Sequence, residues 1–177
     1  MRLLCLIFFT FSSFCLHAQS AAEVYINKYD SLALEVLKFY EIPASLVLGI
    51  GLQESAAGTS KLCRVNHNHF GVKWRVKSPK TKSGQVIAYR KFETDEDAYM
   101  NFGKMIAQKK YYPTLKGNLD YMKWLKAMKA AKYATSSQWI SHVHKMITRY
   151  DLTRFDKLAP GAVLPVPTST DTTIILE

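Results

Sequence analysis

One acidic residue stands out in this chain because of the run that precedes it. Glu54 follows Leu46-Val47-Leu48-Gly49-Ile50-Gly51-Leu52, which is almost wholly apolar. A helix that is apolar on all sides is a buried helix, so we expect one from Pro43, at its first position, to Glu54. A carboxylate at the end of such a helix is poorly solvated, which favours its protonated form. Glycosidases obtain a general acid at neutral pH in this way, while capping of the helix end is the alternative role for Glu54.

The elements that would position Glu54 follow from periodicity and from turn residues. Apolar residues spaced three and four apart predict an amphipathic helix over residues 23–40. Residues 70–76 and 85–92 predict the two strands of a β-hairpin with a basic tip. Further helices are expected from the N-cap Thr94 to the segment 111–113, over residues 119–132 and over residues 137–150. The expected fold class is therefore mainly α, with a helical lobe, a small β-hairpin lobe and a cleft between them.

The two ends of the chain differ in composition from its middle. Residues 1–18 contain a basic Arg2, an apolar stretch and Leu16-His17-Ala18, which together predict a secretory signal peptide. A membrane anchor is the alternative, but the apolar stretch is short for a membrane span. Residues 22–157 are expected to form one catalytic domain, and the Pro/Thr-rich residues 158–177 a flexible tail. The protein is thus expected to be exported to the periplasm or the cell exterior, associated with the envelope, without stable membrane insertion.

The distribution of charge suggests the kind of partner. The chain has a formal net charge of +10, and no Asp or Glu lies between Glu54 and Glu93, where lysines and arginines are frequent. Such a run is usually a solvated face, but beside a candidate acid it suggests the flank of a groove for an anionic substrate. Export favours an envelope polymer over nucleic acid, for which the sequence has no motif beyond its charge.

Four short motifs occur in a recognisable order. They are Glu54-Ser55 with Gly58 and Ser60, Asn68-His69-Phe70-Gly71-Val72-Lys73, Tyr89-Arg90-Lys91-Phe92, and Tyr133-Ala134-Thr135. This series resembles that of the bacterial peptidoglycan endo-β-N-acetylglucosaminidases, glycoside hydrolase family 73, to which the flagellar rod-cap hydrolase domain belongs. The resemblance runs from about Tyr25 to about Phe155. It implies a lysozyme-like fold and cleavage of the β-1,4 bond from N-acetylglucosamine to N-acetylmuramic acid.

The resemblance also implies roles for individual residues. Glu54 matches the general acid, and Tyr133 matches a tyrosine that lines the cleft near the cleaved bond. The expected substrate-binding residues within the motifs are Ser55, Asn68, Phe70, Gly71, Lys73 and Thr135. Trp74, in the basic hairpin, is a better candidate for stacking on a sugar than Trp124 and Trp139, whose helical spacing is typical of a core.

The expected hairpin, residues 73–91, holds no acid, although many family members place a second catalytic carboxylate there. Glu93 follows it and could activate water, but it also fits the N-terminus of the next helix. Two other mechanisms need only Glu54: attack by the substrate's own N-acetyl group, which we favour with Tyr133 holding the sugar, and a transglycosylase reaction that forms an anhydro sugar. A wall-binding module without turnover is the non-enzymatic alternative.

No metal or cofactor is expected. His67 and His69 lie in a loop without a cluster of cysteines or acids nearby in sequence, which argues against a zinc site. His142 and His144 are two residues apart on an expected helix and so point to different faces. Cleavage of the signal peptide would leave Cys63 as the one cysteine, which predicts a domain without an internal disulfide and a small buried role for Cys63.

Overall fold

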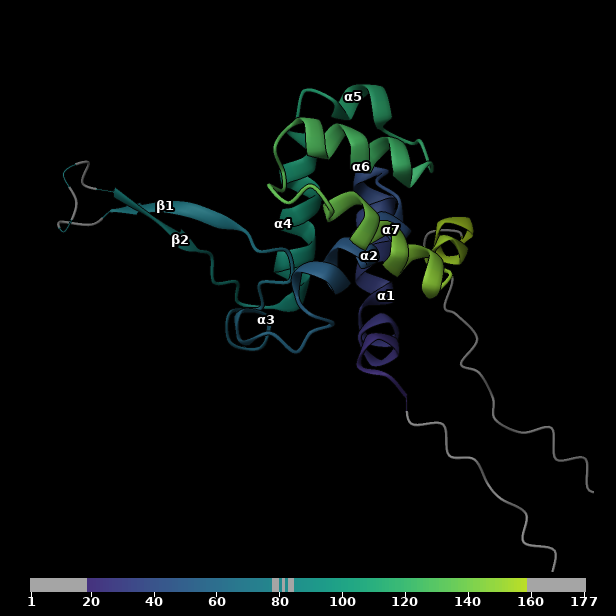
Figure 1. The fold of residues 1–177 in the computed structure, drawn as a ribbon, viewed down its shortest axis with the longest axis horizontal. Coiled ribbons are helices and arrows are strands. Elements are labelled where there is room, and N and C mark those ends of the chain that lie inside the picture. The colour runs from purple at the N-terminus through teal and green to yellow at the C-terminus, as the bar shows by residue number, and fades with distance from the viewer. Residues whose placement is uncertain (1–18, 78–79, 81, 83–84, 159–177) are drawn as a thin grey trace, which may run out of the picture.

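The computed structural model describes residues 19–77, 80, 82 and 85–158 (Figure 1). The predicted signal peptide, nearly all of the predicted tail and much of the hairpin tip lie outside these residues. The described elements, in order, are α1 (Ala21–Tyr40), α2 (Ala44–Glu54), α3 (Lys61–Asn66), β1 (Lys73–Lys77), β2 (Gln85–Tyr89), α4 (Asp95–Ala107), α5 (Tyr112–Leu115), α6 (Tyr121–Ala130), α7 (Trp139–Arg149) and the 3₁₀ helix η1 (Leu152–Lys157).

The first helix begins and ends where the side chains and backbone favour it. Ser20 and Glu23 form a reciprocal capping box, in which the Ser20 hydroxyl accepts from the Glu23 amide and the Glu23 carboxylate accepts from the Ser20 amide. At the other end Glu41 is left-handed, with φ of 51°, and its amide donates to Leu37 O at 2.8 Å. This turn leaves only three residues between α1 and α2 and lets α2 pack back against α1.

Helix α2 forms the centre of the core. Every residue from Ala44 to Leu52 is buried, and α1, α7 and η1 pack around it (Figure 1). Pro43 is the N-cap and not the first helical residue, because its ψ of 130° is extended. Two glycines permit close packing: a Cβ at Gly49 would lie 2.6 Å from Ile147 Cγ1, and one at Gly51 would lie 2.5 Å from the Tyr25 hydroxyl oxygen. The predicted buried helix ending in Glu54 is confirmed.

Three short helices were not predicted from the sequence. α3 follows Ser60, whose hydroxyl accepts from the Cys63 amide at 3.1 Å. α5 occupies the segment 111–113 that was expected only to end a helix, and it has a proline in its first turn. η1 brings Phe155 and Leu152 into the core. The remaining helices match expectation, and the Thr94 hydroxyl caps α4 by accepting from the Asp97 amide at 3.0 Å.

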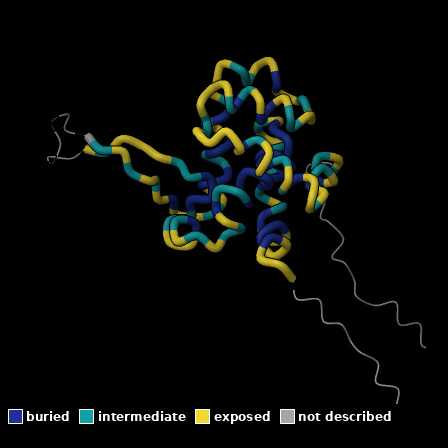
Figure 2. The backbone as a smooth tube through the Cα atoms, in the orientation of Figure 1, coloured by how far each residue is buried: buried dark blue, intermediate teal, exposed yellow. Residues whose placement is uncertain are grey.

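The two strands form an antiparallel hairpin that extends away from the helical body (Figure 1). Its surface is largely exposed, whereas the buried residues concentrate where the helices cross (Figure 2). The predicted hairpin is therefore confirmed, with β2 ending at Tyr89. In the described part of the chain, we find no helix that is both long enough and apolar enough to cross a membrane.

Candidate active site

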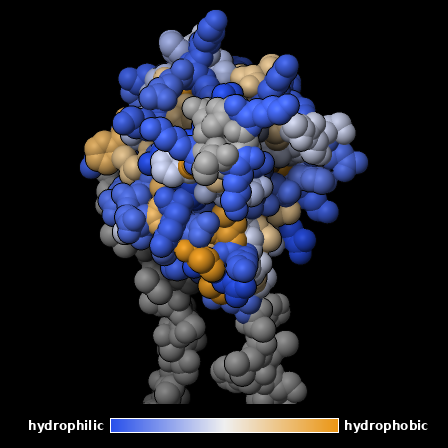
Figure 3. Space-filling view, turned by 90° about the vertical axis from the view of Figure 1, so that its left-hand side faces the viewer, coloured by the Kyte–Doolittle hydropathy of each residue, from blue (hydrophilic) through white to orange (hydrophobic). Residues whose placement is uncertain are grey.

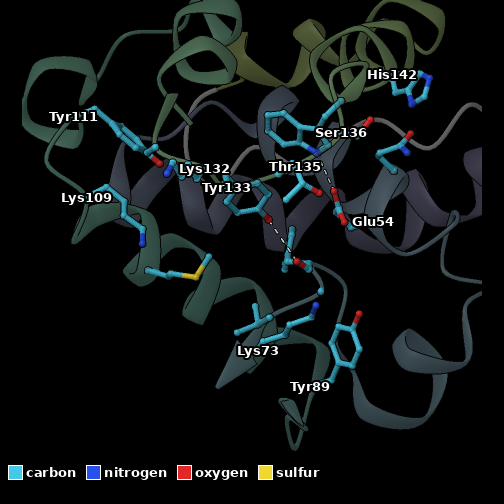
Figure 4. A pocket seen from close by; sticks show the side chains of 18 residues that line it. Glu54, Lys73, Tyr89, Lys109, Tyr111, Lys132, Tyr133, Thr135, Ser136 and His142 are labelled. Atoms are coloured by element: carbon cyan, nitrogen blue, oxygen red, sulfur yellow. Dashed lines mark hydrogen bonds between the residues drawn. The ribbon is translucent and has the colours of Figure 1, made fainter. Parts of the chain in front are cut away.

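A cleft of about 630 Å³ lies where the end of α2 meets the base of the hairpin (Figure 4). Its walls come from the segment before β1, the ends of β2 and α4, the loop between α6 and α7, and α7 itself. The lining residues are Gln53, Glu54, Phe70, Gly71, Val72, Lys73, Tyr89, Met105, Lys109, Tyr111, Ala131, Lys132, Tyr133, Ala134, Thr135, Ser136, Trp139 and His142. Residues far apart in the sequence thus meet around the last residue of α2.

Glu54 is half-buried and held from one side. The indole Nε1 of Trp139 donates to Glu54 Oε1 at 2.8 Å (Figure 4). On the other side, Gly71 has φ of 63°, a conformation that glycine adopts without strain. A Cβ at Gly71 would lie 3.7 Å from Glu54 Oε2, so the missing side chain leaves space beside this oxygen. One carboxylate oxygen is therefore fixed, and the other faces a space that a substrate could enter.

Tyr133 lies across the cleft from Glu54. Its hydroxyl points toward Phe70 O at 3.4 Å, a long contact, and its ring lies 5.2 Å from that of Trp139 (Figure 4). Burial raises the pKa of Tyr133 well above its ordinary value, and the nearby charge of Glu54 raises it further. The phenol therefore stays neutral at physiological pH and remains a hydrogen-bond donor at the cleft wall.

The rest of the cleft is positively charged. Glu54 is the single acid among the described residues that line it, whereas Lys73, Lys109 and Lys132 contribute three cations. The Lys73 ammonium lies 4.8 Å from the centre of the Tyr89 ring, which it faces across the two strands. The backbone of Lys132 is left-handed, with φ of 59°. This conformation is energetically unfavourable for any residue other than glycine. One acid in a cationic cleft suits protonation of a bond in an anionic polymer.

A family model provides the decisive comparison. The model of the glucosaminidase family, described as mannosyl-glycoprotein endo-beta-N-acetylglucosaminidase, matches residues 30–152, which is more than half of the chain. The chain belongs to this family. The domain is therefore a glycosidase domain, as the sequence motifs predicted.

The glucosaminidase domain is similar to several known proteins. The exo-glucosaminidase LytG of Bacillus subtilis strain 168 is 24% identical over 156 residues, an alignment that covers 78% of this chain and 55% of LytG. The chain thus spans about half the length of that relative. The catalytic domain of the autolysin Auto from Listeria monocytogenes has a TM-score of 0.60 and 21% identity, covering 78% of this chain and 89% of that domain. The glycoside hydrolase domain of FlgJ from Salmonella typhimurium has a TM-score of 0.58 and 19% identity, covering 75% and 90%. These structures confirm the predicted lysozyme-like fold.

Five of the predicted site residues come together with Glu54 at the cleft of the glucosaminidase domain. They are Phe70, Gly71, Lys73, Tyr133 and Thr135. Of these, Phe70 is almost fully buried and stacks on Phe102 with a centroid distance of 4.2 Å, so it supports the cleft floor more than it presents a surface. The motif residues that span the hairpin base and the loop after α6 therefore do converge on one site.

Two predicted substrate-binding residues have structural positions instead. Ser55 is buried, and its hydroxyl accepts from the Gly58 amide at 2.8 Å, which shapes the turn after α2. Asn68 is also buried. Its amide nitrogen donates to Val72 O at 2.9 Å and to Arg90 O at 2.8 Å, while its oxygen accepts from the Val72 amide at 2.9 Å. Asn68 thus links, through hydrogen bonds, the backbone just before β1 to the backbone just after β2.

Two other candidates lie away from the cleft lining. Trp74 is half-exposed on the hairpin, with the Arg90 guanidinium 5.5 Å from the centre of its ring. Glu93 is exposed and precedes the N-cap of α4. Neither side chain is among the residues that line the cleft.

The most important residue missed from the sequence is Trp139. Its spacing predicted a core position, and it is indeed buried, but its indole nitrogen reaches Glu54. No sequence signal distinguishes it from Trp124, which is also buried and donates its indole N–H to Asn118 O at 2.7 Å. The cleft residues Lys109, Tyr111 and Lys132 were likewise not singled out. Burial raises the pKa of Tyr111 to about 12, so this phenol is also neutral.

A partly buried polar cluster lies at the start of α4, outside the lining of the cleft. His67 Nδ1 and His69 Nε2 donate to Asp95 Oδ1 at 2.7 Å and 3.0 Å, and the Tyr29 hydroxyl donates to Asp95 Oδ2 at 3.1 Å. With Nε2 protonated, His69 Nδ1 accepts from the Tyr25 hydroxyl at 2.9 Å. Both histidines thus donate to one oxygen of Asp95, and the described residues contain no group of side chains that could hold a metal ion.

This cluster shifts two pKa values. Burial disfavours the charged form of Asp95, but hydrogen bonds from His69 and His67 outweigh it and lower the pKa of Asp95 to about 2. Burial lowers the pKa of His69, although its hydrogen bond to Asp95 acts in the opposite direction. Asp95 is therefore charged and His69 neutral at physiological pH. Cys63 is buried, as predicted, with its sulfur 3.4 Å from His69 Nδ1, and burial raises the pKa of its thiol to about 11.

Proposed function

We propose that this glucosaminidase domain hydrolyses the β-1,4 bonds between N-acetylglucosamine and N-acetylmuramic acid in peptidoglycan, with Glu54 as the general acid. The observation that carries the proposal is the position of Glu54. It is the single acid among the described cleft residues, it ends a rigid buried helix, and one of its oxygens is held by Trp139. General acids of this kind contribute roughly 10²–10⁴-fold to a rate.

The scarcity of acids in the cleft favours a substrate-assisted mechanism. Protonated Glu54 gives its proton to the glycosidic oxygen as the C1–O bond breaks. The carbonyl oxygen of the sugar's own 2-acetamido group attacks C1 and forms a cyclic intermediate, so no enzyme nucleophile is needed. Water then attacks C1 while Glu54 takes its proton and the bond between C1 and the acetamido oxygen breaks, which restores the 2-acetamido group and leaves a new reducing end. The proposal assigns no step to Glu93, because Glu93 does not line the cleft.

Tyr133 is proposed to hold the reacting sugar. Its phenol is neutral, and its hydroxyl makes only a long contact to Phe70 O, so it is available to donate to a substrate oxygen.

Lys73, Lys109 and Lys132 would favour an anionic polymer over a neutral one. Peptidoglycan fits this charge, and export of the protein to the periplasm or the cell exterior would bring it to this substrate. The similarity of the fold to that of the autolysin Auto supports an envelope role.

The test is digestion of purified sacculi with mass analysis of the fragments. We expect the wild-type domain to release fragments that end in reducing N-acetylglucosamine, and Glu54→Gln to lower the rate at least about 10²-fold. Glu93→Gln separates the mechanisms, since a large loss there would identify a second catalytic carboxylate. Anhydro ends would instead identify transglycosylase chemistry. If the wild type binds sacculi but releases no fragments, the non-catalytic wall-binding alternative is correct.

A further inference from the structure

The register of the hairpin divides its side chains between two faces. Lys73 pairs with Tyr89, Arg75 with Ile87 and Lys77 with Gln85, and these pairs alternate with Trp74–Ala88 and Val76–Val86. Successive side chains of a strand point to opposite faces, so Lys73, Arg75, Lys77, Ile87 and Tyr89 share one face. We call these five residues the cationic face. Because Lys73 and Tyr89 also line the cleft, the cationic face begins at the active site and continues outward along the hairpin.

The cationic face is open to solvent. Lys73, Arg75 and Lys77 are all exposed, Ile87 is 69% exposed and Tyr89 is 51% exposed. No acid among the described residues forms an ion pair with any of the three cations. Alternate residues on a strand lie about 7 Å apart, so the cations form a row about 14 Å long. On the opposite face the side chains of Val76, Val86 and Ala88 are partly buried, Trp74 is half-exposed, and none of the four carries a charge.

We propose that the cationic face binds a further stretch of the same glycan strand, beyond the bond that is cleaved, through the free carboxylates of its peptide stems. This inference rests on the proposed function, because it assumes peptidoglycan in the cleft. Exposed cations in a row match an anion repeated along a polymer, and the exposed Ile87 and Tyr89 offer apolar contact to sugar rings. The hairpin would thus hold the polymer in register while Glu54 acts on it.

The surface character favours this occupant over a membrane. Figure 3 looks onto the side of the molecule from which the hairpin extends, and most of that surface is hydrophilic, with hydrophobic residues in several small separate patches. A surface that inserts into lipid would present a broad apolar area instead. Continuity with the cleft also favours the glycan. A glycan chain that leaves the cleft past Lys73 and Tyr89 would next meet Arg75 and Ile87.

The experiment measures binding without cleavage. Glu54→Gln protein is sedimented with sacculi from which hydrofluoric acid has removed phosphate polymers, and its affinity is compared with that of the same protein carrying Arg75→Gln and Lys77→Gln. The matched control carries Lys126→Gln and Lys145→Gln, which removes the same charge from exposed positions on α6 and α7 outside the cleft lining. We expect the hairpin pair to weaken binding about tenfold and the control pair less than about twofold.

A second substrate tests the carboxylates. On sacculi whose carboxylates have been converted to amides, the difference between the two double variants should disappear. The proposal is overturned if both pairs weaken binding equally, if the difference persists on amidated sacculi, if it exists only before the phosphate polymers are removed, or if it appears on anionic lipid vesicles instead of sacculi. Failure of the wild-type protein to cleave sacculi would overturn the proposed function, while the binding comparison would still stand on its own.

Discussion

The helical body and the hairpin form the two sides of one cleft, but different interactions hold them in place. In the body, position comes from side-chain packing: every residue of α2 from Ala44 to Leu52 is buried against its neighbours. In the hairpin, most side chains are exposed, and position comes from hydrogen bonds at its base. Asn68 binds main-chain atoms of Val72 and Arg90, and the Arg90 amide donates to Val72 O at 2.9 Å.

This difference suits the two parts to the tasks proposed for them. A general acid, the role proposed for Glu54, must be held within a fraction of an ångström, which a helix made rigid by packing allows. Recognition of a long polymer, the role proposed for the hairpin, needs exposed groups, which a hairpin can present without weakening the core.

The sharpest test compares one aromatic of the body with one aliphatic residue of the hairpin. Phe102 is fully buried and stacks on Phe70, so Phe102→Ala should lower the free energy of unfolding by about 3–5 kcal/mol. Ile87 is 69% exposed, and Ile87→Ala should change it by less than about 0.5 kcal/mol. Urea unfolding measures both. A cost above about 1 kcal/mol at Ile87 would show that the hairpin contributes to the core after all.

Removal of the amide that fastens the hairpin should have a smaller and more local effect. Asn68→Ala deletes three buried hydrogen bonds and should cost about 2–3 kcal/mol. Hydrogen exchange of the β1 and β2 amides should accelerate more than that of α2. Asn27→Ala, at an exposed position of α1, is the matched control and should change neither. Equal acceleration in both regions would mean that hairpin and body unfold as one unit.

The two buried tryptophans allow a test of catalysis. Trp139→Phe keeps an aromatic ring but removes the donor to Glu54, and should lower kcat about 10- to 100-fold. Trp124→Phe removes an equivalent donor from the core and should affect stability alone. An unchanged kcat in Trp139→Phe would leave Trp139 only a packing role.

The free energy of unfolding should also depend on pH, but more weakly than on the substitutions above. The folded pKa of His69 is lowered, so as pH falls below about 6.5 the unfolded chain takes up a proton that the folded chain resists, and stability decreases. Asp95, with its pKa lowered to about 2, adds a further loss between about pH 4 and pH 2. Urea unfolding between pH 7 and pH 5 should show a shallower slope for His69→Gln than for the wild type. Identical slopes would exclude His69 as the source.

Most of the fold could be predicted from the sequence because its signals are local. Periodic apolar residues predicted α1, the apolar run before Glu54 predicted α2, and Thr94 with the acids after it predicted the start of α4. α3 and α5 were missed because helices of six and four residues are too short to show a period. Their stability comes from Ser60 capping and from tertiary contact, which local patterns do not reveal.

The site was predictable only in part. Glu54 and Tyr133 were found through an apolar run and a motif, and both line the cleft. Trp139 was not found, because a buried tryptophan that donates to a site residue has the same sequence spacing as a tryptophan that only packs in the core. Asn68 was assigned to the substrate, whereas its amide is used up by the backbone. Which way a side chain points across the fold depends on contacts between distant segments, and one sequence does not contain that information.

The way Asn68 holds the hairpin has a consequence for how this protein can change. All three of its hydrogen bonds go to main-chain atoms, so the attachment does not depend on which side chains the strands carry. Residues 73–89 can therefore be exchanged, by evolution or by grafting a hairpin from a relative, without redesign of the helices. Under the proposed function, replacement of this hairpin alone would redirect the same helical body among wall polymers of different composition.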